Sequence, residues 1–122
     1  MKIKKIISND GILNILQNFP FKIKRLYYLN NLKKNNIRFG HAHKKLEQIY
    51  ICLQGSFKIT LINKKKIKKI IYLNKNMNIL KISKMMWRRI KVTADRSVLL
   101  VLASEKFDEK DYIRKFQDFI NS

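Results

Sequence analysis

The stretch Arg38-Phe39-Gly40-His41-Ala42-His43-Lys44-Lys45-Leu46-Glu47 holds both histidines of the chain. His41 and His43 are two residues apart, so in an extended strand both imidazoles point to the same face. A helix would not bring them together, since residues at i and i+2 do not share a helical face. Histidine titrates near neutral pH, so two imidazoles on one face suggest proton transfer or a metal site. The alternative is a chance pair on a surface strand.

Short strands separated by turns are predicted on both sides of this stretch. Expected strands cover residues 3–7, 12–16, 21–29, 46–53, 57–62, 67–73, 80–82, 87–92 and 98–103, with the histidine strand starting at Arg38 after a polar loop at residues 30–36. Turns recur at close to the 8–12-residue spacing of a sandwich or barrel. Only the tail has a helical pattern: Asp108 can cap a helix in which Tyr112, Phe116 and Phe119 or Ile120 share one face. The prediction is an all-β protein with a short C-terminal helix.

Length and cysteine content limit the possible classes. A chain of 122 residues is long enough for one domain with a real core and too short for two ordinary ones, so one domain over residues 1–122 is expected. The single cysteine, Cys52, cannot form an internal disulfide, which fits a reducing cytosol. The basic N-terminus has no apolar stretch behind it, and no apolar run approaches the ~20 residues of a membrane span. A cytoplasmic protein with no membrane partner is therefore expected.

The formal net charge of +20 invites a nucleic-acid interpretation, which the composition does not favour. There are 22 lysines and only 6 arginines, together with 19 isoleucines and 12 asparagines. Lys, Ile and Asn have A/T-rich codons, so this excess is typical of genome composition acting on tolerant surface positions. Proteins that bind nucleic acids rely on arginine forks and stacked aromatic rings, and neither is clustered here. We expect no nucleic-acid partner, and an anionic small ligand instead.

The histidine stretch also has the spacing of a cupin metal box. His41, His43 and Glu47 are followed by a glycine at Gly55, and this pattern in an all-β chain of this length predicts a cupin-type jelly roll. A metal cupin takes a further histidine from a later strand, but this chain has no third histidine. The later strand carries Arg88, and a guanidinium cannot donate a lone pair to a metal. We therefore expect no metal and no cofactor.

Acid–base catalysis is the chemistry that remains. Cys52 lies in an expected core strand and is better explained as a small apolar filler than as a nucleophile. A neutral imidazole can take a proton from a carbon next to a carbonyl, while a second group assists at the enolate oxygen. Two histidines on one face can divide these roles. Arg25 and Arg38 are close to them in sequence and can fix an anionic substrate, although either can equally be a solvated surface residue.

Three separated motifs resemble one known family. They are Phe19-Pro20-Phe21-Lys22-Ile23-Lys24-Arg25-Leu26-Tyr27-Tyr28, then the segment from Arg38 to Gln48, and then Leu100-Val101-Leu102-Ala103-Ser104-Glu105 with Phe107-Asp108-Glu109 and Asp111-Tyr112-Ile113-Arg114. In order and spacing these segments resemble the dTDP-4-oxo-6-deoxyglucose 3,4-ketoisomerases, which are small cupins that make the 3-keto sugar later aminated for surface polysaccharides. The resemblance runs nearly from end to end.

The resemblance implies a homodimer of jelly rolls that exchange N-terminal strands and work without metal. It implies that His41 and His43 are the catalytic residues and act in proton transfer at a dTDP-linked keto-deoxysugar. The expected substrate-binding residues on the matching motifs are Arg25, Tyr27, Arg38, Lys44 and Trp87. The chain departs from the family pattern in three places: the glycine before His41 has moved by one position to Gly40, a Pro-x-x-Trp-His motif is Lys84-Met85-Met86-Trp87-Arg88, and an initial Asp-x-Arg-Gly is reduced to Asp10-Gly11.

The prediction from the sequence is thus a sugar-nucleotide 3,4-ketoisomerase in which His43 removes the C3 proton and His41 assists the enediol. The configuration of the product at C4 and the identity of the nucleotide base stay open. Two alternatives are kept. One is a sugar-nucleotide 3,5-epimerase on a similar roll. The other is a non-catalytic sugar-binding cupin, which the arginine at position 88 would permit.

Overall fold

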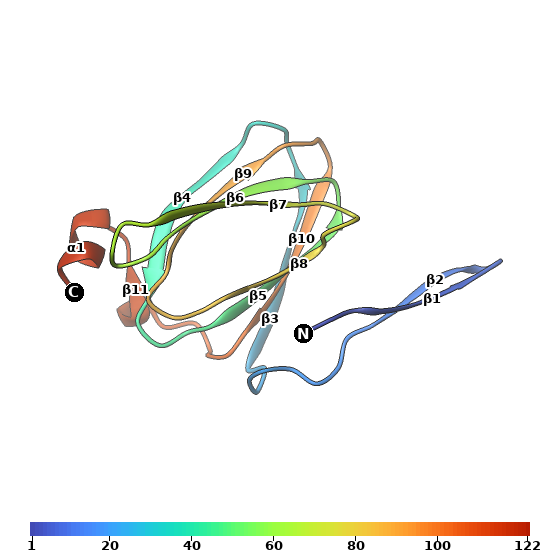
Figure 1. The fold of residues 1–122 in the computed structure, drawn as a ribbon, viewed down its shortest axis with the longest axis horizontal. Helices are drawn as coiled ribbons and strands as arrows, with labels where there is room; N and C mark the ends of the chain where they lie inside the picture. Colours follow the sequence, from blue (N-terminus) through green and yellow to red (C-terminus); the bar gives the residue numbers. More distant parts are fainter.

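Two antiparallel sheets pack face to face in a jelly roll (Figure 1). The computed structural model describes residues 1–122. The four-stranded sheet has the order β3 (Arg25–Leu32), β10 (Ser97–Ala103), β5 (Gln48–Gln54) and β8 (Ile79–Ile82). The five-stranded sheet has the order β11 (Tyr112–Ile113), β4 (Ile37–His43), β9 (Trp87–Val92), β6 (Phe57–Ile62) and β7 (Lys68–Leu73). This architecture, with a short helix α1 (Phe116–Asn121) near the C-terminus, confirms the expected fold class.

Alternating apolar side chains build the core between the sheets. On β6, Phe57, Ile59 and Leu61 point inward and are buried, while the residues between them are partly exposed. This is the period-2 pattern of a strand with one face on the core. Strand β5 is different because Gln48 to Cys52 are all buried. Its outer face is covered by side chains from the N-terminal region, among them Ile3 and Phe21, which explains its nearly continuous apolar sequence.

Most predicted strands begin and end within two residues of their predicted limits, and two predicted elements differ by more. The strand expected over residues 21–29 is β3, which begins at Arg25 and continues to Leu32, into the segment predicted to be a loop. Phe21 and Ile23 do not pair in the sheet, because their side chains pack on the outer face of the four-stranded sheet. Leu32 pairs with Ser97 beyond a bulge in β3, where three steps from Leu29 to Leu32 match two steps along β10, and this pairing extends the strand.

The single helix predicted from Asp108 is wrong, because the tail is divided into three short elements. Asp108 does cap a helical turn, accepting a hydrogen bond from the Lys110 N–H, but this turn is a 3₁₀ helix over Glu109–Asp111. The next two residues, Tyr112 and Ile113, form β11 and pair with β4. Pairing with an open sheet edge satisfies backbone groups that a longer helix would have satisfied internally. Helix α1 begins only at Phe116.

A β-bulge interrupts β4 just before the first histidine. Arg38 pairs with Ile90 of β9, and His41 pairs with Arg88, so three steps along β4 match two steps along β9. The extra residue lies at Phe39 or Gly40, and it brings Arg38 and His41 to the same side of the strand although they are an odd number of residues apart. A Cβ atom at Gly40 would collide with the indole of Trp87, so only glycine fits here.

Replacing Gly40 with alanine should lower the free energy of unfolding by about 1–3 kcal/mol, the usual cost of forcing an extra methyl group into a packed site. The indole of Trp87 cannot move away freely, since the rings of Phe116 and Phe119 pack against it with centres 5.3 and 5.8 Å away. Urea unfolding measures the change in stability. Trp87 is the only tryptophan, so its fluorescence reports the local displacement directly. An unchanged midpoint with unchanged emission would contradict this account.

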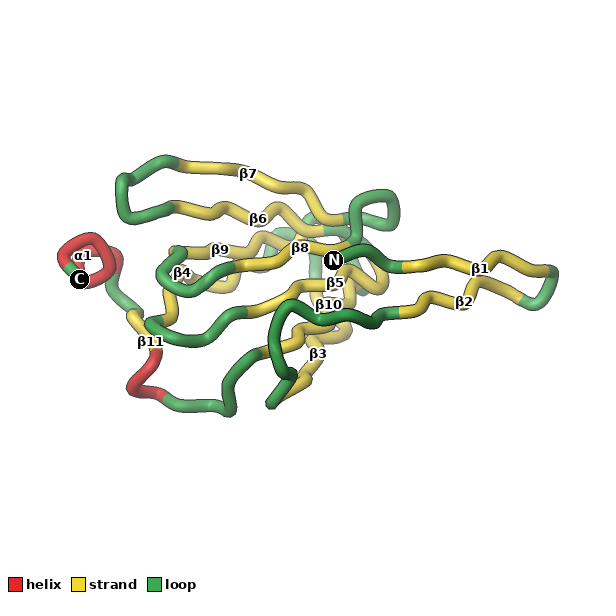
Figure 2. The backbone as a smooth tube through the Cα atoms, turned by 60° about the horizontal axis from the view of Figure 1, so that its bottom comes forward, coloured by secondary structure: helices red, strands yellow, loops and turns green.

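A hairpin of β1 (Lys4–Ser8) and β2 (Gly11–Ile15) projects from the roll, at the opposite end of the molecule from α1 (Figures 1 and 2). Its two strands pair only with each other. Ile7 and Ile12 are opposite each other in the hairpin and are 76% and 57% exposed. Neither helical segment of the structure has the length and hydropathy of a membrane span.

Candidate functional site

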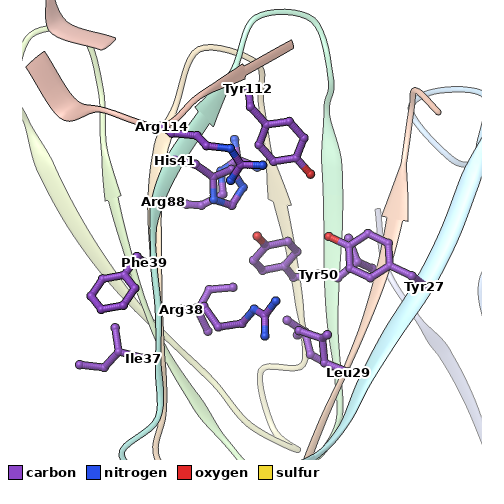
Figure 3. A pocket seen from close by; sticks show the side chains of 13 residues that line it. Tyr27, Leu29, Ile37, Arg38, Phe39, His41, Tyr50, Arg88, Tyr112 and Arg114 are labelled. Carbon is purple, nitrogen blue, oxygen red and sulfur yellow. The ribbon is translucent and has the colours of Figure 1, made fainter. Parts of the chain in front are cut away.

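A cavity of about 480 Å³ is enclosed by both sheets and by the C-terminal tail (Figure 3). Its wall consists of Tyr27 and Leu29 of β3, Ile37, Arg38, Phe39 and His41 of β4, Tyr50 of β5, Arg88 and Ile90 of β9, Leu99 and Val101 of β10, and Tyr112 and Arg114 of the tail. Tyr50 and Arg88 are buried, whereas Arg38, Phe39 and Arg114 are exposed and mark the solvent side. A mostly apolar cavity with a few polar groups is typical of a small-molecule site.

The two histidines form a perpendicular pair at this cavity. Their ring centres are 4.9 Å apart and their planes meet at 89°. His41 is partly exposed and lines the cavity, whereas His43 is completely buried. The ring of Tyr112 contacts both, with its centre 5.4 Å from His41 and 4.3 Å from His43. The expectation that both imidazoles lie on one strand face therefore agrees with the geometry.

His43 is held from behind by the carboxylate of Asp111. Its Nδ1 atom lies 3.2 Å from Asp111 Oδ2, while its Nε2 atom is buried and has no hydrogen-bond partner. The Asp111 side chain is only 11% exposed. A buried nitrogen without a partner is uncommon and costs free energy, so it is a marker of a functional site.

A buried arginine lies beside the histidines. Arg88 is fully buried, and its guanidinium donates to Gln48 Oε1 and, at 2.9 Å, to the Met86 carbonyl oxygen. Gln48 in turn donates to the hydroxyl of Tyr27 at 3.1 Å. The acceptors of Arg88 are neutral, and burial lowers the pKa of its guanidinium. Burial also raises the pKa of the neighbouring Tyr50 to about 12.

Both histidines are held in the neutral form by their surroundings. Burial is the main cause and the positive charge of Arg88 the second, and together they lower the pKa of His41 and the pKa of His43 to about 3. Low dielectric disfavours an imidazolium, and a nearby cation disfavours it further. At neutral pH both imidazoles are therefore neutral, and each has one unprotonated ring nitrogen.

The expected substrate-binding residues fall into two groups in the structure. Tyr27 and Arg38 line the cavity. Arg25 lies next to it, with its guanidinium carbon 5.2 Å from the ring centre of Tyr27 and with Nε and Nη2 buried and without partners. Lys44 is exposed in the turn after β4, and Trp87 packs in a small core with Phe119, so neither lines the cavity.

Glu47, the third member of the possible metal box, does not join the histidines. Its carboxylate forms an ion pair with Lys81 at 3.3 Å. No three His, Cys, Asp or Glu side chains lie close enough together to hold a metal ion.

Five residues of the site were not predicted as such: Tyr50, Arg88, Asp111, Tyr112 and Arg114. Tyr50 is inside an apolar run and looks like a core residue. Asp111 and Tyr112 were assigned to a helix, which hides their position beside His43. Asp111, Tyr112 and Arg114 do lie in the third motif of the family resemblance, but no role was assigned to them. Arg88 was noted as an arginine in the strand predicted over residues 87–92, where it suggested a loss of function rather than part of the site.

Comparison with known proteins finds similarity over nearly the whole chain. The family described as "FdtA: WxcM-like, C-terminal" matches residues 1–122. The TDP-4-oxo-6-deoxy-alpha-D-glucose-3,4-oxoisomerase of Aneurinibacillus thermoaerophilus is 38% identical over 119 residues, which cover 95% of this chain and 85% of that protein.

Solved structures show the same likeness. QdtA, a sugar 3,4-ketoisomerase from Thermoanaerobacterium thermosaccharolyticum in complex with TDP, has a TM-score of 0.91 and 42% identity, covering 98% of this chain and 89% of QdtA. The WlaRB TDP-quinovose 3,4-ketoisomerase from Campylobacter jejuni has a TM-score of 0.90 and 41% identity, covering 98% of this chain and 94% of WlaRB. A histidine-to-asparagine variant of QdtA has been solved with TDP-4-keto-6-deoxyglucose.

Proposed function

The chain belongs to the FdtA family, described as WxcM-like, C-terminal, and from this membership we propose that it is a 3,4-ketoisomerase acting on a TDP-linked 4-keto-6-deoxyhexose. The observation that carries the proposal is the neutral pair His41 and His43 at the cavity, with the Nε2 atom of His43 buried and without a partner. Two imidazoles with lone pairs are suited to moving protons, and the reaction consists only of proton transfers.

In the proposed mechanism His43 removes the C3 proton, which the neighbouring C4 ketone makes acidic. The electron pair left on C3 forms a C3–C4 double bond, and the ketone oxygen becomes an enolate. The proton on O3 then passes to O4 with the help of His41, and protonation of C4 by the imidazolium gives the C3 ketone. One C–H bond breaks and another forms, so no external oxidant or reductant is required.

The rings of His41 and Tyr112 both contact His43 and line the cavity, whereas His43 does not line it. We therefore infer that substrate binding displaces the Tyr112 side chain, giving the sugar access to the Nε2 atom. Catalytic contacts commonly tighten only in the substrate complex. The guanidinium carbon of Arg114 lies 4.2 Å from the ring centre of Tyr112, so the two side chains would move together.

Charge at the cavity suits a nucleoside diphosphate. Arg38 and Arg114 line its exposed side, and Arg25 has two buried N–H donors without partners. Guanidinium groups bind phosphate oxygens through paired hydrogen bonds, which is the strongest recognition these side chains offer. The apolar wall and the tyrosines leave room for the sugar and the base. We propose that the diphosphate binds at the arginines and the keto sugar reaches the histidines.

Incubation with TDP-4-keto-6-deoxyglucose in deuterated water, followed by proton NMR, tests the function. We expect a 3-keto product. Deuterium appears at C4 where the His43 imidazolium exchanges its proton with solvent before it protonates C4, and the hydrogen from C3 appears there where it does not. Deuterium at C5 of the unchanged 4-keto sugar would favour the epimerase alternative. No change in the sugar, with TDP binding intact, would favour the non-catalytic binder.

We further propose that the enzyme is a homodimer and that the β1–β2 hairpin packs on a second copy. A two-stranded hairpin is at best marginally stable alone in water, so this one requires a surface to rest on. Ile7 and Ile12 form an exposed apolar patch on one face, and Ile6 and Leu13 form another on the opposite face. Leu26 and Tyr28, on the outer face of the four-stranded sheet, are also more than half exposed and offer an apolar partner surface.

Replacing both Ile7 and Ile12 with lysine should convert the dimer to a monomer, because two apolar side chains that the dimer interface would bury are exchanged for charges. Light scattering coupled to gel filtration measures the mass. Ile67→Lys is the matched control, since Ile67 is 61% exposed at the tip of another hairpin and should leave the dimer intact. A monomeric wild type, or a double variant that stays dimeric, would contradict the proposal.

We also propose a cytoplasmic location and a role in supplying deoxysugars for surface polysaccharide. The buried free thiol of Cys52 fits a reducing compartment. A ketone at C3 is the group with which an amine condenses, so a 3-keto product fits a following amination step.

A further inference from the structure

We propose that Asp111 is a positioning residue that fixes the ring tautomer of His43, so that Nε2 is the nitrogen that takes the proton. The expected effect on kcat rests on the proposed function, whereas the contact between Asp111 and His43 and the tautomer that it fixes do not. The two residues are 68 positions apart, so spacing along the chain does not predict that they are in contact.

The hydrogen bonds of Asp111 fix its carboxylate as the acceptor in its contact with the imidazole of His43. Oδ1 accepts the backbone N–H of Lys45 at 2.8 Å, and Oδ2 accepts the backbone N–H of Leu46 at 3.2 Å. Two fixed donors thus hold the carboxylate in place as an acceptor. Because an ionised carboxylate only accepts, the Nδ1 atom of His43, 3.2 Å from Oδ2, must be the protonated ring nitrogen.

The other ring nitrogen is then the basic one. In a neutral imidazole one nitrogen carries hydrogen and the other a lone pair. With Nδ1 protonated, the lone pair is on Nε2, and this atom is buried without any hydrogen-bond partner. Leaving a buried acceptor unpaired is unfavourable, so the arrangement is explained if the substrate supplies the missing partner.

The backbone makes this geometry rigid. The Lys44 N–H donates to the Asp111 carbonyl oxygen at 3.0 Å, and Tyr112 pairs with His43 in the ladder between β11 and β4. Asp111 is thus joined to the histidine strand on both sides of its own side chain. A carboxylate held this way keeps the imidazole in one tautomer and one orientation, as the aspartate of a serine-protease triad does.

Asp111→Asn tests the proposal with almost no change of shape. An asparagine has one acceptor oxygen, so it can replace Oδ1 or Oδ2 but not both. The shorter bond, from the Lys45 N–H at 2.8 Å, favours the oxygen at the Oδ1 position, so the NH₂ takes the place of Oδ2, faces Nδ1 and donates to it. That forces the ring proton onto Nε2. We expect kcat to fall by ~10²–10⁴, as in triads where the same exchange gives the wrong tautomer, while TDP affinity and KM change only a few-fold.

Nitrogen-15 NMR of labelled histidine reads the tautomer directly, without substrate. The chain has only two histidines, so the His41→Asn variant assigns the spectrum. We expect wild-type His43 to be protonated at Nδ1 and the Asp111→Asn variant to be protonated at Nε2. The matched control is Asp108→Asn, the same exchange three residues earlier. There asparagine can still cap the 3₁₀ turn, so tautomer and kcat should stay as in the wild type.

A wild-type spectrum with His43 protonated at Nε2 would overturn the proposal, and this measurement needs no variant that must fold. An Asp111→Asn variant with unchanged tautomer and kcat within a few-fold would overturn it as well. A tautomer that switches as expected in a protein without ketoisomerase activity would support the positioning contact and refute the proposed function, so the two failures are distinguishable.

Discussion

His43→Asn should abolish measurable isomerisation, with a loss of at least the ~10²–10⁴-fold that a general acid–base group contributes. Asparagine has about the size and polarity of histidine, but it cannot accept a proton near neutral pH. TDP binding should persist, because the arginines and tyrosines of the cavity hold the nucleotide in the proposed complex. Calorimetric titration with TDP and the NMR assay of turnover measure the two properties separately.

His41→Asn should also be severely impaired, since the enediol would lose the group that helps the proton from O3 to O4. Lys45→Asn is the control, because the Lys45 side chain is exposed and does not line the cavity, so turnover should be unchanged. If both histidine variants fold, bind TDP and turn over within a few-fold of the wild type, the catalytic assignment is wrong and the non-catalytic binder takes its place.

Acidification should destabilise the fold through the two histidines. Their pKa values are about 3 in the folded protein, against about 6.5 in the unfolded chain. Between these values the unfolded chain binds more protons, so stability rises with pH and is lost as pH falls below about 6.5. From about pH 7.5 to about pH 5 the loss should be about 2 kcal/mol for each histidine.

Urea unfolding of the wild type and of the double variant His41→Asn/His43→Asn, at about pH 7.5 and about pH 5, measures the loss of stability that the histidines cause. The other titrating groups are common to the two proteins, so they cancel in the comparison. The variant should lose less stability on acidification than the wild type. Equal losses would show that the histidines titrate normally in the folded protein.

The same pKa values set the pH dependence of the reaction. Both imidazoles of the free enzyme are neutral at any pH well above 3, so kcat/KM should have no acid limb from histidine between about pH 7.5 and about pH 5. The ordinary pKa of histidine would predict a decline in this range. A fall centred near pH 6.5 would show that substrate encounters histidines with normal pKa values.

The alternation of apolar and polar residues predicted the strands well, because successive side chains of a strand point to opposite faces of the sheet. The limits expected for residues 57–62 and 87–92 agree with β6 and β9, where one face is buried and the other is not. The same rule placed His41 and His43 on one face. Alternation alone would put Arg38 on the face opposite His41, because the two are three residues apart. The bulge at Phe39 or Gly40 reverses this, and Arg38 lines the cavity together with His41.

The tail was predicted less well because two structures compete for the same residues. Tyr112, Phe116 and Phe119 have helical spacing, but Tyr112 pairs with β4 and the helix begins only at Phe116. That competition depends on an open strand edge formed 70 residues earlier, which no local window can detect. Trp87 was likewise assigned to the substrate, whereas the missing side chain at Gly40 gives its indole a place in the core.

The contact between His43 and Asp111 also has a consequence for the order of events during protein synthesis. The histidine strand is translated 68 residues before the carboxylate that completes it, so the nascent roll carries His43 without its partner until the tail is made. Closing so long a loop is among the slower steps of folding. A chain that ends before Asp111 would thus have both histidines, Arg25 and Arg38, but neither Arg114 nor an oriented base, and it would not isomerise the sugar.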